Sequence, residues 1–446
     1  MLLKPVVGLY GILEATEEGG EAASRLLSAV SERLRAEGMD VKQAPEVVGS
    51  DQTALSAARY FRSVEPDLLV AVVITWSFDS LHVTILKRVP VPLAILSVPG
   101  IRSGSIVGAQ QLGSLLKDLG KEHAIFYGPE RDPSTYTPVV AYALAAAARR
   151  KLEMGKLGYV GRRTPGMTPI AFDEVEIARR FGPLMELYGW EEIEDLAKAA
   201  SKGEVAAQMD RMRKAGRMDS AEGSLEYSVR LWIALRDLAR QRGILAWGIG
   251  CYPHYAGHAC LPVGMLTEDG IPAGCEGDLN AALVMYLLQS FTGQPAHFGE
   301  ILEIDEEKNT LITSHCGCGS PSLAARPAAI HLTPVRLFDR GVSIRYPAKA
   351  APQTTYVNLT GRAGTYRMCA AGGSAIETEM VFEGNPVAFR AKVPVRWLLS
   401  RIAEEGFGHH WMMAYGDSIA PLRSFCRMCG VPLTVPEEDV RAEPVL

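Results

Sequence analysis

The first hundred residues alternate short apolar runs with amphipathic segments. The apolar runs are rich in β-branched residues and read PVVGLYGI, DLLVAVVIT and VPLAIL, while EAASRLLSAVSERLRAEG and QTALSAARYFRSV between them have helical spacing. This alternation is typical of a parallel, doubly wound sheet that helices cover on both faces. Such a sheet places its ligand site at the carboxyl ends of its strands.

The same alternation returns after a long helical segment, VVAYALAAAARRKLEMG. Further along the chain a different hydrophobic pattern replaces it. After SPSLAARP the chain has short alternating runs such as VSIRYPA and TTYVNLTGRAG, which indicate antiparallel strands in a barrel or sandwich. A chain of 446 residues also exceeds the size of a single growing core. We therefore expect two Rossmann-like α/β domains at 1–155 and 156–322. A β-rich, barrel-like domain with terminal helices should follow at 323–446.

Composition narrows the class of function. The chain is 48% hydrophobic and 22% charged, and its net charge of -5 gives no electrostatic reason to expect nucleic acid. The N-terminal residues resemble neither a secretory signal nor a transit peptide, and no apolar stretch is long enough to span a membrane, so a cytoplasmic location is expected. The eight cysteines are then expected to be free thiols. A G-x-G-x-x-G turn is absent, which argues against a nicotinamide cofactor.

Two carboxylates lie at opposite ends of one apolar helical segment. Glu276 stands in the Gly-rich stretch AGCEGD directly before LNAALVMYLLQSFTG, which Asp278 can cap, and Glu300 follows in HFGE. That helix is about 20 Å long, so a strand running back beside it can return Glu300 to the level of Glu276. Two adjacent carboxylates repel unless a cation compensates them, which predicts a divalent metal site.

Imidazoles in two later segments can complete this site. His315 ends a strand-like run in LITSHCGCGS, and His409 and His410 follow a helix in GFGHHWMMAYGD. Carboxylates with one or two imidazoles favour Mn²⁺, with Mg²⁺ and Co²⁺ as alternatives. All of these residues lie in junctions between elements, where binding sites are commonly built.

EGDLNAAL, the carboxylate in HFGE, the following ITSH and the late GHHW resemble the L-arabinose isomerase and L-fucose isomerase superfamily. The resemblance implies that Glu276 and Glu300 are both metal ligands and the catalytic acid/base pair. It also implies Mn²⁺ as the metal and, as further ligands, His315 and one residue of the pair His409 and His410. Alignment of the pair favours His410 as the ligand and His409 as a substrate contact. The implied reaction interconverts an aldose and its ketose through an enediolate.

The same resemblance extends to the N-terminal part of the chain. Trp76 in VVITWSFDSLH and Gln110 in IVGAQQLGSLL are similar to substrate-contacting residues of arabinose isomerases. It further implies a homo-oligomer, a trimer or a hexamer, in which the N-terminal domain of one copy completes the pocket of a neighbour. The expected partner is a monosaccharide, which the sequence does not identify among fucose, arabinose, other deoxy or sulfonated sugars and free pentoses.

Other readings stay open on the sequence alone. Two α/β lobes also describe a cytoplasmic sugar-binding or regulatory protein, and a sugar epimerase or hydrolase can use the same metal ligands. His254 and His258 in CYPHYAGHACLPVGM have i, i+4 spacing, although the surrounding Pro and Gly residues favour a loop.

The cysteine motifs allow one more metal site. C-x-C at Cys316 and Cys318 and C-x-x-C at Cys426 and Cys429 are both zinc-ligand spacings. The second motif falls in an expected helix, however, where the same spacing is as easily a buried apolar pair.

Overall fold

The computed structural model describes residues 2–442, and the chain divides into two compact units. One unit spans Leu3–Arg150. The other runs from Lys151 to the end of the described chain and also takes in Leu2.

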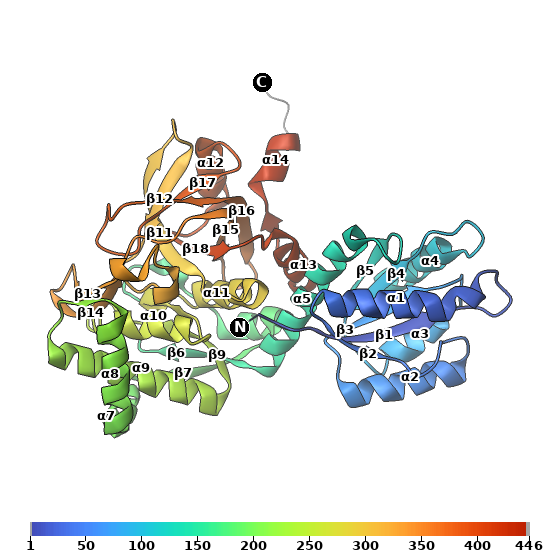
Figure 1. Ribbon diagram of the computed structural model, residues 1–446, viewed down its shortest axis with the longest axis horizontal. Helices are drawn as coiled ribbons and strands as arrows, with labels where there is room; N and C mark the ends of the chain where they lie inside the picture. Colours follow the sequence, from blue (N-terminus) through green and yellow to red (C-terminus); the bar gives the residue numbers. More distant parts are fainter. Residues whose placement is uncertain (1, 443–446) are drawn as a thin grey trace. The chain divides into compact units, whose positions relative to one another are not determined.

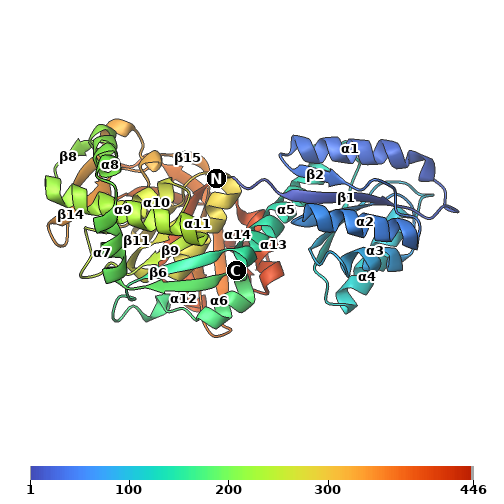
Figure 2. The ribbon, with the colours of Figure 1, turned by 90° about the horizontal axis from the view of Figure 1, so that it is seen from below.

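The N-terminal unit is a doubly wound parallel sheet. The five strands have the order β2-β1-β3-β4-β5, and every neighbouring pair is parallel. Helices lie on both faces of this sheet, drawn in blue to cyan in Figures 1 and 2. Its strands are β1 (Val6–Ile12), β2 (Asp40–Gln43), β3 (Leu68–Val73), β4 (Leu93–Ser97) and β5 (His123–Tyr127). Its helices are α1 (Ala23–Ala36), α2 (Asp51–Val64), α3 (Asp79–Leu86), α4 (Ser105–Asp118) and α5 (Pro133–Met154).

The second unit begins with another parallel sheet, of order β10-β9-β6-β7. The strands are β6 (Lys156–Val160), β7 (Leu184–Tyr188), β9 (Ile244–Ile249) and β10 (Ala273–Gly274). The helices between them are α6 (Glu174–Phe181), α7 (Trp190–Ala199), α8 (Lys202–Ala215), α9 (Glu222–Arg242) and α10 (Cys260–Glu268). A small separate sheet of order β14-β13-β8 is formed by β8 (Arg217–Met218), β13 (His331–Val335) and β14 (Arg340–Arg345).

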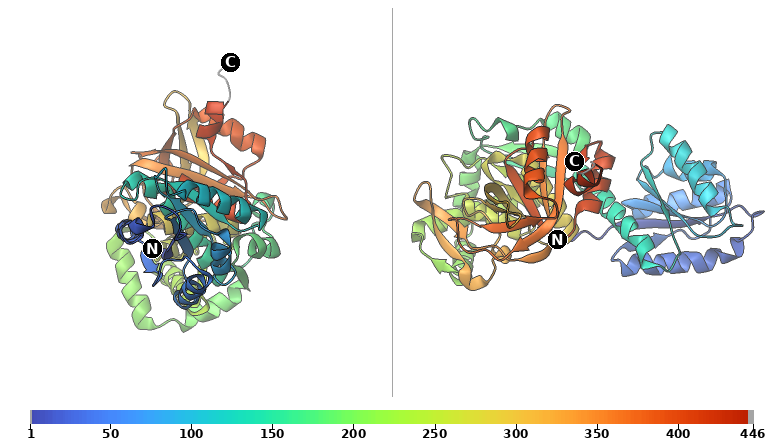
Figure 3. Two further views of the ribbon diagram at one scale, coloured as in Figure 1. Left: turned by 90° about the vertical axis from the view of Figure 1, so that its right-hand side faces the viewer. Right: turned by 90° about the horizontal axis from the view of Figure 1, so that it is seen from above.

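The C-terminal strands form a closed barrel. Their order is β15-β18-β11-β12-β17-β16, and β16 pairs again with β15, so the sheet closes on itself. These strands are β11 (His297–Asp305), β12 (Thr310–Ser314), β15 (Ala351–Thr360), β16 (Arg367–Ile376), β17 (Val387–Ala391) and β18 (His410–Tyr415). The remaining elements are β19 (Leu433–Thr434), which adds to β16, and helices α12 (Val395–Glu405), α13 (Ile419–Cys429) and α14 (Pro436–Ala442). The right-hand view of Figure 3 shows the orange and red strands over the green and yellow elements of the parallel sheet.

Helix α11 (Leu279–Thr292) joins the two sheets of this unit. It packs against β9 and β10 on one side and against β15 and β18 on the other, as Figure 1 shows in yellow. Every residue from Leu279 to Phe291 is buried. A helix that is apolar around its whole circumference is expected to be buried in this way, and the packing confirms the helix expected from the sequence.

The predicted fold class, two parallel α/β sheets and a β-rich C-terminal region, is confirmed. The division into three domains at 155/156 and 322/323 remains a prediction. The hairpin of β11 and β12 precedes the second of these boundaries, yet it pairs with β17 and β18 in the barrel. Within residues 2–442, no helix is both long and apolar enough to cross a membrane.

Candidate functional site

Glu276 lies in a strained turn between β10 and α11. It adopts a left-handed backbone conformation with φ 60° and ψ 12°, and it is followed by Gly277 with φ 82°. A Cβ atom at Gly277 would lie 2.5 Å from the hydroxyl of Tyr159, so the tight turn requires glycine there. A left-handed conformation is costly for a glutamate, and such strain is commonly found at functional sites.

Asp278 connects this turn to the C-terminal barrel. One carboxylate oxygen accepts a hydrogen bond from the backbone N–H of Ala281 at 2.9 Å and caps α11. The other lies 2.9 Å from Nδ1 of His410. The carboxylate accepts a hydrogen bond from Nδ1–H, which leaves Nε2 of the same ring free to act as a ligand.

Glu300 reaches the same imidazole from the barrel. Glu300 on β11 and His410 on β18 are direct partners in the antiparallel register. The Oε1 atom of Glu300 lies 3.9 Å from Nε2 of His410, and Oε2 of Glu276 lies 3.4 Å from that nitrogen. The structure therefore brings together the two carboxylates that the sequence singles out, on one face of His410.

This cluster contains buried polar atoms without partners. The side chain of His410 is 1% exposed and that of Glu276 is 13% exposed. Within the described residues, Nε2 of His410 and Oε2 of Glu276 have no hydrogen-bond partner. Because buried polar atoms are normally satisfied, two such atoms facing each other indicate a missing cation or substrate group.

The electrostatic state of the cluster follows from its contacts. Burial lowers the pKa of His410, but its contacts with Asp278 and Glu276 outweigh burial and raise it to about 9. Burial raises the pKa of Glu276, whereas the contact with His410 and the charges of His315 and His410 bring it below its usual value. Without a metal, a proton on His410 can balance the negative charge; a bound cation would replace that proton.

His315 and His409 complete two groups of candidate ligands. His315 follows β12, and its ring packs edge-on against Phe298, with ring centroids 4.8 Å apart. One set of ligand atoms, from Glu300, His315 and His410, lies within 4.8 Å of one another, and so does a second set, from Glu276, His409 and His410. His409 is 37% exposed and lies 3.8 Å from Glu300, so it stands at the open side of the cluster.

Trp76 and Gln110 belong to the N-terminal unit. Trp76 follows β3, and its indole N–H donates to Gln111 at 2.9 Å. Gln110 is exposed on α4. In this region the residue bonded to the indole is therefore Gln111 and not its neighbour.

The two alternative metal sites considered on the sequence are not assembled. Nε2 of His254 lies 3.5 Å from a guanidinium nitrogen of Arg162, and the His258 ring packs edge-on against Tyr227. Cys426 lies on α13 with its sulfur 3.5 Å from that of Met368. Among residues 2–442, no group of three candidate ligands includes His254, His258, Cys426 or Cys429.

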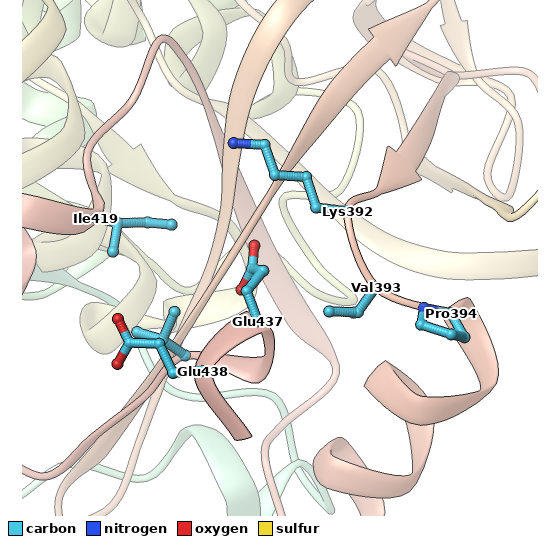
Figure 4. A pocket seen from close by; sticks show the side chains of 7 residues that line it. Lys392, Val393, Pro394, Ile419, Glu437 and Glu438 are labelled. Atoms are coloured by element: carbon cyan, nitrogen blue, oxygen red, sulfur yellow. The ribbon is translucent and has the colours of Figure 1, made fainter. Parts of the chain in front are cut away.

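A cavity of about 100 Å³ opens onto the acidic pair. Glu276, Glu300 and His315 line one part of it, and Arg336 and Phe382 line another. A larger cavity of about 360 Å³ lies away from the acidic pair, beside α14, and is lined by Lys392, Glu437 and Glu438 among others (Figure 4). The large cavity contains none of the histidines, so we assign the chemistry to the smaller one.

Sequence reasoning missed two features of this site. Asp278 was expected only as a helix cap, although its second oxygen also orients His410. The sequence signal for this second role is the position of Asp278 two residues after Glu276. The cavity lining also includes Arg336, from the turn between β13 and β14, and no sequence motif marks that residue.

Comparisons with known proteins agree with the motifs. No family model matches the chain. The chain is 25% identical to a sulfoquinovose isomerase of Clostridium sp. (strain MSTE9), over 91% of this chain and 92% of that protein. It is 22% identical to a sulfoquinovose isomerase of Alkalicoccus urumqiensis, over 83% of this chain and 86% of that protein. It is also 22% identical to an L-arabinose isomerase of Acidothermus cellulolyticus, over 76% of this chain and 71% of that protein.

These similarities extend over most of the chain and span both compact units. Together with the fold and with the carboxylates that meet at His410, they fit the sugar isomerase superfamily and support an aldose–ketose isomerase.

Proposed function

We propose that this isomerase is metal-dependent and that Glu276, Glu300, His315 and His410 hold its divalent cation. Mn²⁺ is the proposed metal, with Mg²⁺ and Co²⁺ as alternatives, because the ligands are carboxylate oxygens and imidazole nitrogens. The observation that carries the proposal is the approach of both carboxylates to the free Nε2 of His410, at 3.4 and 3.9 Å.

The distances fit a shared cation. With metal–ligand bonds of about 2.1 Å, adjacent ligands of an octahedral site lie about 3 Å apart and opposite ligands about 4.2 Å apart. The two distances at His410 fall between these limits. Small side-chain movements would therefore bring all three atoms onto one ion.

The residues of the chain have separate roles in the reaction. A cation bound here would polarise the carbonyl and the adjacent hydroxyl of an open-chain sugar. Glu276 and Glu300 act as the acid/base pair: a carboxylate accepts the proton from the carbon beside the carbonyl and returns it to the neighbouring carbon. Asp278 holds His410 in one orientation, and His409 contacts a substrate hydroxyl at the open side of the cavity.

Arg336 supports an anionic sugar as the substrate. The side chain is exposed at the cavity, its guanidinium lies 5.2 Å from the centre of the Phe382 ring, and no carboxylate within residues 2–442 pairs with it. Arginine is well suited to bind a sulfonate with two parallel hydrogen bonds. We therefore propose sulfoquinovose, the sugar in the names of the Clostridium and Alkalicoccus relatives, as the substrate.

The proposal includes a homo-oligomer, a trimer or a hexamer, in the cytoplasm. A cavity of about 100 Å³ is smaller than typical ligand pockets of about 300–1,000 Å³. Every residue that lines it comes from the unit after Lys151. We propose that the N-terminal unit of a neighbouring copy, with Trp76 and Gln110, supplies the missing wall.

Replacing either acid should abolish isomerisation. The Glu276→Gln and Glu300→Gln variants should each lose at least about 10²- to 10⁴-fold in kcat, because the acid/base pair is broken. Turnover is measured with Mn²⁺ present, and analysis of the products separates an isomerase from an epimerase. Glu303→Gln, on the exposed part of β11, is the matched control and should keep its activity. Near-normal turnover in either acid variant would refute the assigned role.

Asp278→Asn should change the pH dependence of metal binding. In the native protein a proton must leave His410, whose pKa is about 9, so Mn²⁺ affinity should rise with pH until about pH 9. Without the Asp278 charge the pKa of His410 falls, and affinity should level off at a lower pH. The maximal Mn²⁺ affinity should drop about 10- to 100-fold, because the imidazole of His410 is held less firmly.

This experiment is calorimetric titration with Mn²⁺ under anaerobic conditions from pH 6 to 9.5. Asparagine is as good a helix cap as aspartate, so α11 should keep its stability. Identical pH profiles for the two proteins would show that Asp278 does not control the charge of His410.

Arg336→Gln should discriminate between charged and neutral sugars. Losing a charge-assisted contact should raise KM for sulfoquinovose about 10- to 100-fold and leave any turnover of L-arabinose or L-fucose unchanged. Arg396→Gln, an exposed arginine paired with Glu306, is the control. Equal losses on both kinds of sugar, or none, would contradict the anionic substrate.

Mixing two inactive variants tests the shared pocket. Trp76→Ala should disrupt the wall that the N-terminal unit supplies, and Glu300→Gln should remove one catalytic acid. A homo-oligomer of either variant alone should therefore be inactive. Co-expressed chains should recover measurable activity, because some pockets then combine an intact wall with an intact centre. Failure to recover activity in oligomers shown to be mixed would rule out a pocket built by two copies.

A further inference from the structure

A cluster of thiols lies beside the acidic pair, Glu276 and Glu300. The described chain holds eight free cysteines, of which seven are buried. Five of the eight form one cluster of neighbouring thiols, in which two contact the ring of His315; the five are Cys251, Cys260, Cys275, Cys316 and Cys318. They come from three separate parts of the chain, which the fold brings to one place: the loop from β9 into α10, the turn before α11 and the turn after β12.

We propose that Cys275, Cys318 and His315 form a second metal site, for a thiophilic ion of the Zn²⁺ class. The ligand atoms of these three residues all lie within 4.8 Å of one another. Cys316 stands beside them and can supply a fourth ligand. This site shares only His315 with the proposed Mn²⁺ site and takes a different class of ion, and its test measures thiolate binding and not turnover.

The distances match a tetrahedral site. With Zn–S bonds of about 2.3 Å and Zn–N bonds of about 2.0 Å, a tetrahedron has S···N edges of about 3.5 Å and S···S edges of about 3.8 Å. Nδ1 of His315 lies 3.5 Å from the sulfur of Cys318 and 3.2 Å from that of Cys316. The sulfur of Cys275, the third proposed ligand, lies within 4.8 Å of the sulfur of Cys318 and of a ring nitrogen of His315.

A metal site accounts for this arrangement of thiols better than ordinary apolar packing does. Buried cysteines often act as small apolar side chains, and Cys426 does so, with its sulfur against Met368. The thiols near His315 instead face one another and a ring nitrogen. Two thiolates and an imidazole favour Zn²⁺ over Mn²⁺ or Mg²⁺, which prefer oxygen ligands.

One imidazole takes part in both groups of ligands. His315 belongs to the thiol group through Nδ1, and it also belongs to the group with Glu300 and His410. The thiol group favours a thiophilic ion and the group with Glu300 favours an ion that prefers oxygen ligands, so the two groups would select different ions. A thiophilic ion would bind to the thiol group even when the carboxylates are altered.

The test is metal titration of the full-length protein, purified with a reductant and stripped by a chelator. We expect one Co²⁺ per chain to give the near-ultraviolet charge-transfer band of thiolate-bound cobalt, and one equivalent of Zn²⁺ to remove that band. The Glu300→Gln variant should keep the band, because its thiols are intact. A native protein with no thiolate band would overturn the proposal.

Variants identify the ligands. The double variant Cys275→Ser/Cys318→Ser should lose the band, whereas Cys426→Ser, the buried control, should keep it. A band that survives in the double variant, or disappears equally in the control, would refute the assignment. Should the double variant fail to fold, ¹¹³Cd NMR of the native protein decides: a shift in the sulfur-ligand range supports the site, and a shift in the oxygen-ligand range overturns it.

Discussion

The hydrogen bond between Asp278 and His410 is the contact on which the site depends. Asp278 stands at the first turn of the buried helix α11, and His410 stands at the first residue of barrel strand β18. The bond spans 132 positions in sequence and fixes which imidazole nitrogen faces the carboxylates. It links the turn that carries Glu276 to the barrel strand that carries His410.

The packing of α11 makes this contact rigid. The helix is buried over its whole length between β9 and β10 on one side and β15 and β18 on the other, so its N-terminus cannot shift without disturbing both sheets. The strained turn at Glu276 is held at that terminus. A left-handed glutamate is tolerated there because the surrounding structure leaves it no alternative conformation.

The sequence predicted the architecture and the convergence of the two carboxylates at His410 better than the details of their surroundings. Hydrophobic periodicity identified the parallel sheets, helix α11 and the β-rich region, because each has a strong local pattern. The convergence of Glu276, Glu300 and His410 was predictable from an acid at each end of one helix and from the family motifs.

Contacts between distant turns could not be predicted in this way. The bond from Asp278 to His410 and the gathering of Cys251, Cys260 and Cys275 near His315 depend on three-dimensional proximity, which spacing along the chain does not encode. The pairing of β11 with β18 and of β12 with β17 is not encoded in spacing either. An apolar run does not reveal which sheet it will join.

The order of the barrel strands has a consequence for protein synthesis. β18 is the last of the six ring strands along the chain, and it inserts between β11 and β15, which are made much earlier. A nascent chain therefore carries an open sheet until the segment around His410 has left the ribosome. The enzyme acquires its closed barrel and its central imidazole in the same final step, so a chain truncated before that segment lacks both.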